Sequence, residues 1–481
     1  MSLRQKTVSG LFWSSVDSLS SQGIQFVIGI ILARILTPKE FGLIGMVTVF
    51  IAISGSFING GFSSALIRKK DCTQSDFSTV FFFNLISGIV FFVLLLLLAP
   101  AISIFFNEPE LKSIVRVLAF VLIIDSVTII QQTILTKRID FKLQTRISII
   151  ASATSGVFAI TLAYKGLGVW SLVVMTLTRQ ALNSFFLWLW NKWRPVLIFS
   201  RNSFRELFGF GSKLLISSLI DTIYRNIFHL VIGKYFSAQE LGYYTRASQF
   251  NSVPSQSITG IMSRVTYPVL AQMQENPEIL KTVYKRMIRS TMLVTFVLML
   301  GLASVARPMI MTLIGEKWEP SVIYLQLLCF SGMFYPLHAI NLNMLNVHGR
   351  SDIFLRLEII KKTLIIPTII IGIILGVKIM LATMILNNLI GYYLNSYWSG
   401  KFINYSTKEQ VKDITPSFLL AVGMSLVVFT IGHFLTTSYM LTLILQITAG
   451  IVIVFATCEL TKMSDYFYLK QIVFEKVHGR K

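Results

Sequence analysis

The chain has 481 residues, of which 54% are hydrophobic and only 14% are charged. Soluble domains carry about 25% charged residues, so this composition excludes a water-soluble enzyme and predicts a polytopic membrane protein. The net charge of +21 therefore raises the question of which membrane face is basic, and it does not require a nucleic-acid partner.

Long runs without Asp, Glu, Lys or Arg cover residues 41–67, 77–107, 379–400 and 414–458. The last run is long enough for two spans, with a turn at Thr436, Thr437 and Ser438. The stretch 12–22 is too polar for a signal peptide, so the first helix is expected to be retained. The sequence predicts about fourteen spans, at residues 10–34, 42–66, 77–105, 112–135, 147–165, 168–190, 212–234, 241–267, 288–314, 321–345, 358–376, 378–399, 414–435 and 439–458.

The distribution of cations predicts the orientation of these spans. With the N-terminus in the cytoplasm, the inner segments hold 30 Lys and Arg residues, from Arg4 to Lys481, and the outer turns hold 7. Because cytoplasmic loops are enriched in Lys and Arg, both termini are expected to be cytoplasmic. No outer turn is long enough to fold as an extracellular domain.

An internal repeat divides the chain. Residues 31–50 (ILARILTPKEFGLIGMVTVF) align with residues 231–250 (VIGKYFSAQELGYYTRASQF) at an offset of 200, which pairs Glu40 with Glu240 and Gly42 with Gly242. Six spans separate the copies, so the halves are parallel repeats related by an axis along the membrane normal. The expected domains are a first lobe at 1–190, a cytoplasmic linker at 191–211, a second lobe at 212–400, and two extra helices with a cytoplasmic tail at 401–481.

One charged stripe lies inside the seventh span. Asp221, Arg225 and His229 are spaced at i, i+4 and i+8, so they share one helix face, which Ser217 and Ser218 extend. At about 1.5 Å per residue, Arg225 lies near mid-membrane. Two interpretations are open: an Asp221–Arg225 pair that satisfies itself, or a cavity lining that meets an anionic headgroup.

Further polar residues inside spans are candidates for substrate binding. Arg246 lies near Tyr244 and Gln249, where aromatic and amide groups suit sugars and a guanidinium suits diphosphate oxygens; the alternative is snorkelling to the interface. For Arg179, Asp17 and Asp125 two interpretations are open: a side chain that lines a cavity, or a structural hydrogen bond between helices.

Three scattered cysteines, Cys72, Cys329 and Cys458, give no metal-binding or disulfide pattern, so no metal and no cofactor are expected.

The stretches 10–46 (GLFWSSVDSLSSQGIQFVIGIILARILTPKEFGLIGM), 232–250 (IGKYFSAQELGYYTRASQF) and 263–274 (SRVTYPVLAQMQ) resemble the Wzx-type polysaccharide exporters of the multidrug/oligosaccharidyl-lipid/polysaccharide superfamily. The resemblance implies two six-helix lobes around a cavity, as in the multidrug MATE transporters, followed by two C-terminal helices. It also implies a flippase for undecaprenyl-diphosphate-linked oligosaccharide in the bacterial inner membrane, serving lipopolysaccharide, capsule or exopolysaccharide synthesis. Membrane lipid and a polysaccharide polymerase would be its partners.

Two other functions remain open. A cation-coupled drug antiporter could use the same fold, although such a cavity is usually acidic and the mid-span charges here are mainly cationic. A membrane-embedded polymerase or glycosyltransferase is the other alternative, and it usually needs a sizeable extracytoplasmic loop. No Walker A, GxSxG or HExxH motif occurs, so we expect a transporter without enzymatic activity.

Overall fold

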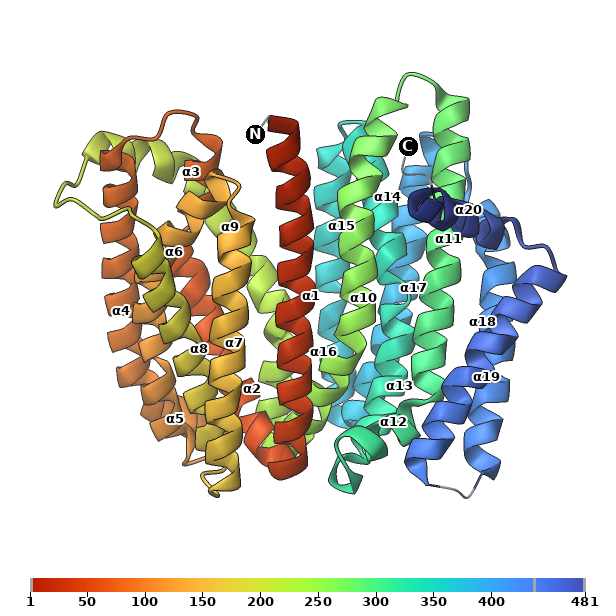
Figure 1. Cartoon of the computed structure of the whole chain (residues 1–481), viewed down its shortest axis with the longest axis horizontal. Coiled ribbons are helices and arrows are strands. Elements are labelled where there is room, and N and C mark those ends of the chain that lie inside the picture. Colours follow the sequence, from red (N-terminus) through yellow and green to blue (C-terminus); the bar gives the residue numbers. More distant parts are fainter. Residues whose placement is uncertain (1–2, 436–437, 479–481) are drawn as a thin grey trace. The chain divides into compact units, whose positions relative to one another are not determined.

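The computed structural model describes residues 3–435 and 438–478, and in these residues the chain is built from α-helices joined by short turns (Figure 1). Thr436 and Thr437, part of the predicted turn, lie outside the described residues, as do the side chains of residues 3–12, 14, 15, 18, 472, 473 and 476–478. Tertiary contacts group the chain into two compact units, Met1–Gly242 and Tyr243–Lys481. The division into lobes at residues 190 and 212 stays a prediction.

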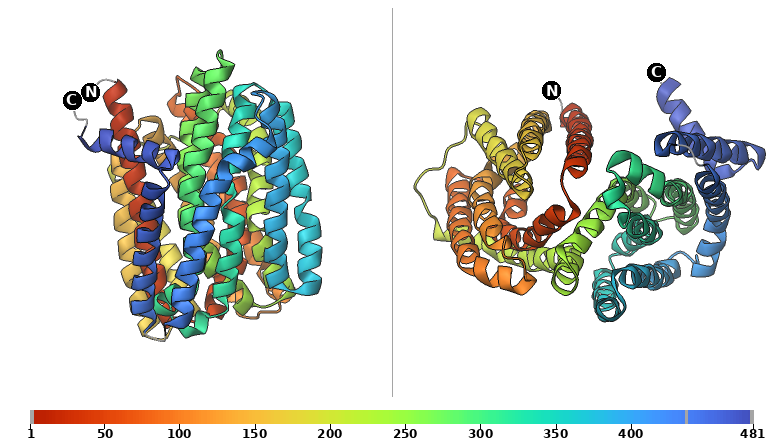
Figure 2. Two further views of the ribbon diagram at one scale, coloured as in Figure 1. Left: turned by 90° about the vertical axis from the view of Figure 1, so that its right-hand side faces the viewer. Right: turned by 90° about the horizontal axis from the view of Figure 1, so that it is seen from below.

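The helices of the first unit run roughly parallel to one another, as the end-on view of Figure 2 shows. Neighbouring pairs are α1 with α7, α4 with α6, and α2 with α9. The helices are α1 (Leu3–Ile35), α2 (Pro38–Asn59), α3 (Phe62–Arg68), α4 (Gln74–Phe106), α5 (Leu111–Leu118), α6 (Phe120–Lys137), α7 (Phe141–Tyr164), α8 (Val169–Trp190) and α9 (Arg201–Tyr235).

The second unit is built mainly around α11, which packs along α18, while α16 packs against α17. The last helix, α20, lies across α11 and is held there by Arg289, which donates to Asp465 and Ser464 (Figure 1). The helices are α10 (Ala238–Gln272), which begins in the first unit, α11 (Pro277–Ser304), α12 (Ala306–Leu313), the 3-10 helix η1 (Glu316–Trp318), α13 (Ser321–Gly332), α14 (Tyr335–Val347), α15 (Ser351–Thr363), α16 (Ile365–Leu375), α17 (Val377–Lys401), α18 (Thr407–Phe434), α19 (Tyr439–Leu460) and α20 (Ser464–His478).

Each predicted span corresponds to one described helix or to two consecutive ones. Eleven of them are long and apolar enough to cross a membrane by length and composition. The remaining three correspond to α1, α10 and the pair α15–α16. The apolar part of α1 is short, α10 is more polar, and the pair α15–α16 is interrupted.

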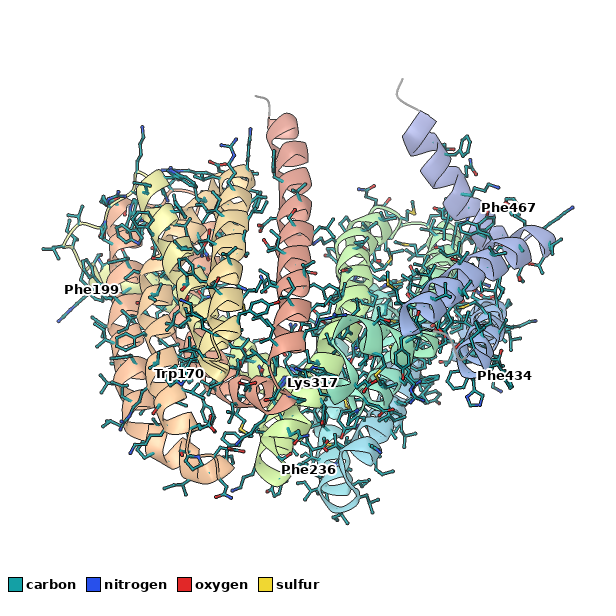
Figure 3. The ribbon with its side chains drawn as sticks, turned by 60° about the horizontal axis from the view of Figure 1, so that its bottom comes forward. Trp170, Phe199, Phe236, Lys317, Phe434 and Phe467 are labelled. Carbon is teal, nitrogen blue, oxygen red and sulfur yellow. The ribbon has the colours of Figure 1, made fainter. Side chains whose placement is uncertain are left out.

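Large apolar side chains remain exposed, such as Ile104 at 79% and Phe434 at 78%, and Phe199, Phe434 and Phe467 project outward (Figure 3). Such exposure suits a lipid environment.

The predicted linker is only partly irregular. Residues 191–200 have no helix, but α9 begins at Arg201, so its first three turns occupy the range expected to be linker. Ser200 caps this start, because its side chain accepts a hydrogen bond from the Ser203 N–H. Phe204 and Phe208 of these turns pack near the ring of Phe62. Apolar packing on α3 therefore extends α9 beyond its membrane-spanning part.

The two copies of the repeat cross each other at a close contact within the first unit. A Cβ placed on Gly42 would lie 1.6 Å from the backbone oxygen of Ala238, and one on Gly242 would lie 1.9 Å from that of Pro38. The contact is reciprocal at the offset of 200 residues, and only glycine lets two helix backbones approach so closely. The repeat seen in the sequence is thus also a repeat in local structure.

The same helix starts are capped by equivalent residues. The carboxylate of Glu40 accepts from the N–H of Thr37 at 2.5 Å and from its hydroxyl at 2.9 Å. In the second copy the hydroxyl of Ser237 accepts from the N–H of Glu240 at 3.1 Å. A carboxylate in the first turn is also favoured by the helix dipole, so residues at equivalent positions of the repeat stabilise both helix starts.

Candidate functional site

The charged stripe of the seventh span lies on α9 and lines an open cavity. Asp221 and Arg225 are both solvent-exposed. Ser217 and Ser218, about one turn before Asp221 and two turns before Arg225, are exposed as well. These four residues form one wall of a cavity of about 460 Å³. The side chain of Arg225 therefore reaches water-accessible space inside the first unit, although α9 is long and apolar enough to span a membrane.

The opposite wall comes from the end of α2 and the start of α3. We call this space the α2–α9 cavity; its lining residues are Ser56, Asn59, Gly61, Ser64, Leu214, Ser217, Ser218, Asp221, Thr222 and Arg225. A hydrogen bond of 2.9 Å between the hydroxyls of Ser56 and Thr222 joins the two walls. Hydroxyl and amide groups thus surround one cation and one anion.

The glycine pair between α2 and α3 shapes this cavity. Gly60 and Gly61 both have positive φ, at 55° and 71°, which most other residues avoid. The turn they make directs α3 along α9, and a Cβ on Gly61 would lie 2.4 Å from the backbone oxygen of Gly211. Glycine here lets α3 and α9 meet while the cavity stays open beside them.

Sequence reasoning found the α9 wall and missed the α2–α3 wall. The missed residues Ser56, Asn59 and Ser64 lie in a span without charge, so no titratable group marked them. The signal was nevertheless present, because the stretch 54–64 (SGSFINGGFSS) is unusually rich in small and polar residues for a membrane helix. His229, on the same predicted helix face as Asp221 and Arg225, is partly buried and is not among the residues that line the cavity.

Arg246 is held inside the second unit. It is only 6% exposed, donates from Nη1 to the side-chain oxygen of Gln249, and has its Cζ 5.9 Å from the ring centroid of Trp318. Tyr244 is buried as well. The three predicted residues Arg246, Gln249 and Tyr244 therefore occupy one region of α10. In this conformation the guanidinium is covered, so snorkelling to an interface does not describe it.

Three other predicted residues, Arg179, Asp125 and Asp17, take part in contacts between or within helices. Gln180 donates to the carboxylate of Asp125, which links α8 to α6, and Asp125 and the neighbouring Arg179 attract each other. Asp17 on α1 accepts a hydrogen bond of 3.4 Å from Ser21 one turn later. None of these three residues lines the α2–α9 cavity. Their roles in substrate binding stay predictions.

Comparisons with known proteins agree with the observed architecture. Residues 31–323 match the family described as "Polysaccharide biosynthesis protein". The chain is 27% identical over 438 residues to the teichuronic acid biosynthesis protein TuaB of Bacillus subtilis, covering 90% of each chain. It is 28% identical over 379 residues to the lipopolysaccharide biosynthesis protein WzxC of Escherichia coli, covering 77% of this chain and 76% of that one.

A solved structure shows the same fold. The lipid II flippase MurJ, in an inward closed conformation, superposes with a TM-score of 0.77 over 96% of this chain and 100% of its own, at 15% identity. At that identity the match establishes the fold alone. The predicted fold class, an all-helical membrane protein with about fourteen spans, is confirmed.

Proposed function

Because the chain belongs to the polysaccharide biosynthesis protein family, we propose that it is a flippase for lipid-linked oligosaccharide. Its substrate is a saccharide carried on undecaprenyl diphosphate, which it moves across the bacterial inner membrane for surface polysaccharide synthesis. The names of TuaB and WzxC support the pathway class, and the fold shared with a lipid II flippase supports the type of transport.

The α2–α9 cavity is the observation that carries this proposal. A lipid-linked saccharide has a diphosphate that must lose water and a sugar that must keep hydrogen bonds as it crosses. In the cavity, the guanidinium of Arg225 supplies a planar donor for phosphate oxygens, and Ser56, Asn59 and Ser64 supply hydroxyl and amide groups for a saccharide. Asp221, one turn from Arg225, orients the guanidinium and keeps the site from binding an anion too tightly to release it.

Transport rather than catalysis fits this lining. The cavity presents serines, an asparagine and one Asp–Arg combination, and none of its described lining residues is a histidine or cysteine. We therefore propose alternating access without chemical change of the substrate. Arg179, His229, Asp17, Arg246, Gln249 and Tyr244 are proposed as further contacts that the substrate meets in other conformations.

The orientation follows from the positive-inside rule. Segments such as 68–70, 137–146 and 281–289 concentrate cations at one set of helix ends, and we place these ends in the cytoplasm together with both termini. A first lobe of residues 1–190 and a second of residues 212–400 then alternate access between the two faces. A polysaccharide polymerase acting on the outer face would use the delivered units.

Deleting the gene in its source bacterium tests this function. We expect undecaprenyl-linked saccharide units to accumulate on the inner leaflet while surface polysaccharide is lost, and the plasmid-borne gene to reverse both changes. Extraction of the lipid-linked pool followed by mass spectrometry identifies the unit. Unchanged surface polysaccharide and an unchanged lipid-linked pool, in cells without a second copy of the gene, would refute the proposed function.

A further inference from the structure

A second cavity continues the seam between α3 and α9. It has a volume of about 450 Å³ and is lined by Ala65, Arg68, Lys69, Glu206, Leu207 and Phe210. We call it the α3–α9 cavity. On α3 its lining begins at Ala65, directly after Ser64 of the α2–α9 cavity, and on α9 it ends at Phe210, one turn before Leu214. The two cavities are therefore consecutive along the same pair of helices.

Arg68 is the exposed cation of this second cavity. Its Cζ lies 4.5 Å from the ring centroid of Phe210, so the guanidinium is held over an aromatic face. In the described part of the chain it forms no ion pair with a carboxylate. A guanidinium fixed in this way keeps its hydrogen-bond donors available for an incoming anion.

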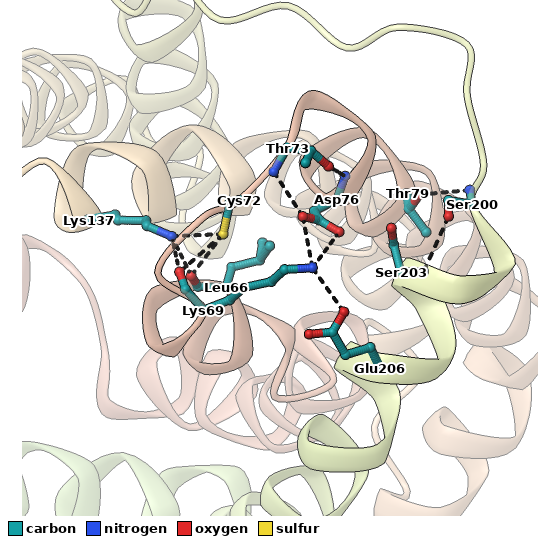
Figure 4. Close-up of polar contacts among 10 residues, drawn as sticks. All are labelled: Leu66, Lys69, Cys72, Thr73, Asp76, Thr79, Lys137, Ser200, Ser203 and Glu206. Carbon is teal, nitrogen blue, oxygen red and sulfur yellow. Dashed lines mark hydrogen bonds and ion pairs between the residues drawn. The ribbon is translucent and has the colours of Figure 1, made fainter.

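Lys69 lies between two carboxylates of very different exposure (Figure 4). Its Nζ is 3.1 Å from Asp76, whose side chain is 2% exposed, and 2.9 Å from Glu206, whose side chain is 61% exposed. The pKa of Lys69 is raised above its ordinary value, chiefly by the hydrogen bond with Glu206. Asp76 is thus a fixed partner, whereas the exposed Glu206 forms the kind of surface ion pair that contributes little and is readily exchanged.

The chain around these cations is held in place. Lys137 of α6 donates to the backbone oxygen of Leu66 at 3.0 Å and also to that of Lys69 (Figure 4). Asp76 accepts from the N–H of Thr73 at 2.9 Å, which caps the start of α4. The end of α3 is therefore fixed on two sides, and Glu206 on α9 is the member of the cluster that can move away.

We propose that Arg68 and Lys69 form a separate docking site for the diphosphate of the lipid-linked substrate, with Glu206 as the group that the diphosphate displaces. This inference rests on the proposed function. The headgroup docks here at the predicted cytoplasmic end and then follows the α3–α9 seam to Arg225. Glu206 and Arg225 are 19 residues apart on one helix, about 28 Å at 1.5 Å per residue, so one diphosphate cannot occupy both sites.

Equilibrium binding of a water-soluble short-chain prenyl diphosphate tests the docking site. The full chain is held in phosphatidylcholine nanodiscs, and affinity is measured by calorimetry with Arg225→Ala as the background, so that binding at the α2–α9 cavity is weakened. In this background Arg68→Gln should weaken binding roughly tenfold, the effect of one charge-assisted hydrogen bond. Glu206→Gln should tighten it up to about fivefold, since an exposed ion pair no longer competes.

Lys70→Gln is the matched control, because Lys70 is exposed, adjacent to Arg68 and outside both cavities. Equal effects of Arg68→Gln and Lys70→Gln would overturn the docking site, as would an affinity unchanged by Glu206→Gln. If phosphatidylglycerol added to the nanodisc displaces the prenyl diphosphate at equal concentration, the site is a phospholipid site and the docking proposal is overturned. If the wild-type protein exports polysaccharide, and Arg68→Gln binds the prenyl diphosphate and exports normally, the docking site is refuted. The proposed function then remains intact. A wild-type protein that neither binds the prenyl diphosphate nor exports refutes both.

Discussion

Arg225→Ala is expected to lower polysaccharide export at least about tenfold, because a charge-assisted hydrogen bond contributes roughly 1.5–3 kcal/mol and about 1.4 kcal/mol is a factor of ten. The guanidinium faces the α2–α9 cavity and is its one cationic lining group among the described residues. Arg225→Lys should restore only part of the export, since an ammonium cannot bind a phosphate in a bidentate way. Export is measured as surface polysaccharide in the deletion strain carrying each variant.

Arg205→Ala serves as the matched control for this substitution. Arg205 lies on the same helix, is exposed, and lines neither cavity. It should export at the wild-type rate, and both variants should be present in the membrane at normal levels. Wild-type export by Arg225→Ala would show that the guanidinium does not hold substrate, and the interpretation of a self-satisfied Asp221–Arg225 pair would stand.

Gly42→Ala is expected to destabilise the fold strongly. Its Cβ would lie 1.6 Å from a backbone oxygen, and a backbone atom cannot rotate away as a side chain can. Overpacking in a tight interior costs about 1–3 kcal/mol, and a clash with backbone on both helices should reach the top of that range or exceed it. Gly242→Ala should act alike, because the contact is reciprocal. The thermal unfolding temperature of detergent-solubilised protein measures the effect.

Gly55→Ala provides the comparison within the same helix. No atom outside its own helix lies within 4 Å of a Cβ built at Gly55, and alanine is the better helix former. This variant should unfold at the wild-type temperature or above it. If Gly42→Ala were as stable as Gly55→Ala, the close crossing of α2 and α10 at the repeat would not exist as described.

The membrane spans could be predicted because they depend on local composition. Uncharged runs of more than 18 residues must be helices in lipid, where every backbone group needs an internal partner. The offset repeat was equally visible, since Glu40 and Glu240 each lie in the first turn of a helix, three residues after Thr37 and Ser237. Arg225 and Asp221 could be assigned to a shared face from their spacing alone.

The rest depended on contacts between distant segments. Ser56, Asn59 and Ser64 become functional candidates only because Gly60 and Gly61 turn α3 along α9, and no charge marks them in the sequence. Arg246 could not be distinguished from an exposed arginine, because the residue that covers it, Trp318, lies in η1, far along the chain. Likewise, Lys69 and Glu206 are separated by 137 residues and meet only in the fold.

We propose that this chain moves a lipid-linked saccharide across a bilayer and that Arg225 takes part. The most direct measurement reconstitutes the purified protein in vesicles with a fluorescently labelled undecaprenyl-diphosphate saccharide and follows, with a membrane-impermeant quencher, how fast the label crosses. Wild-type vesicles should equilibrate the label between leaflets much faster than protein-free vesicles, with Arg225→Ala close to the protein-free rate. Equal rates for wild-type and protein-free vesicles, with correctly inserted protein, would contradict the account.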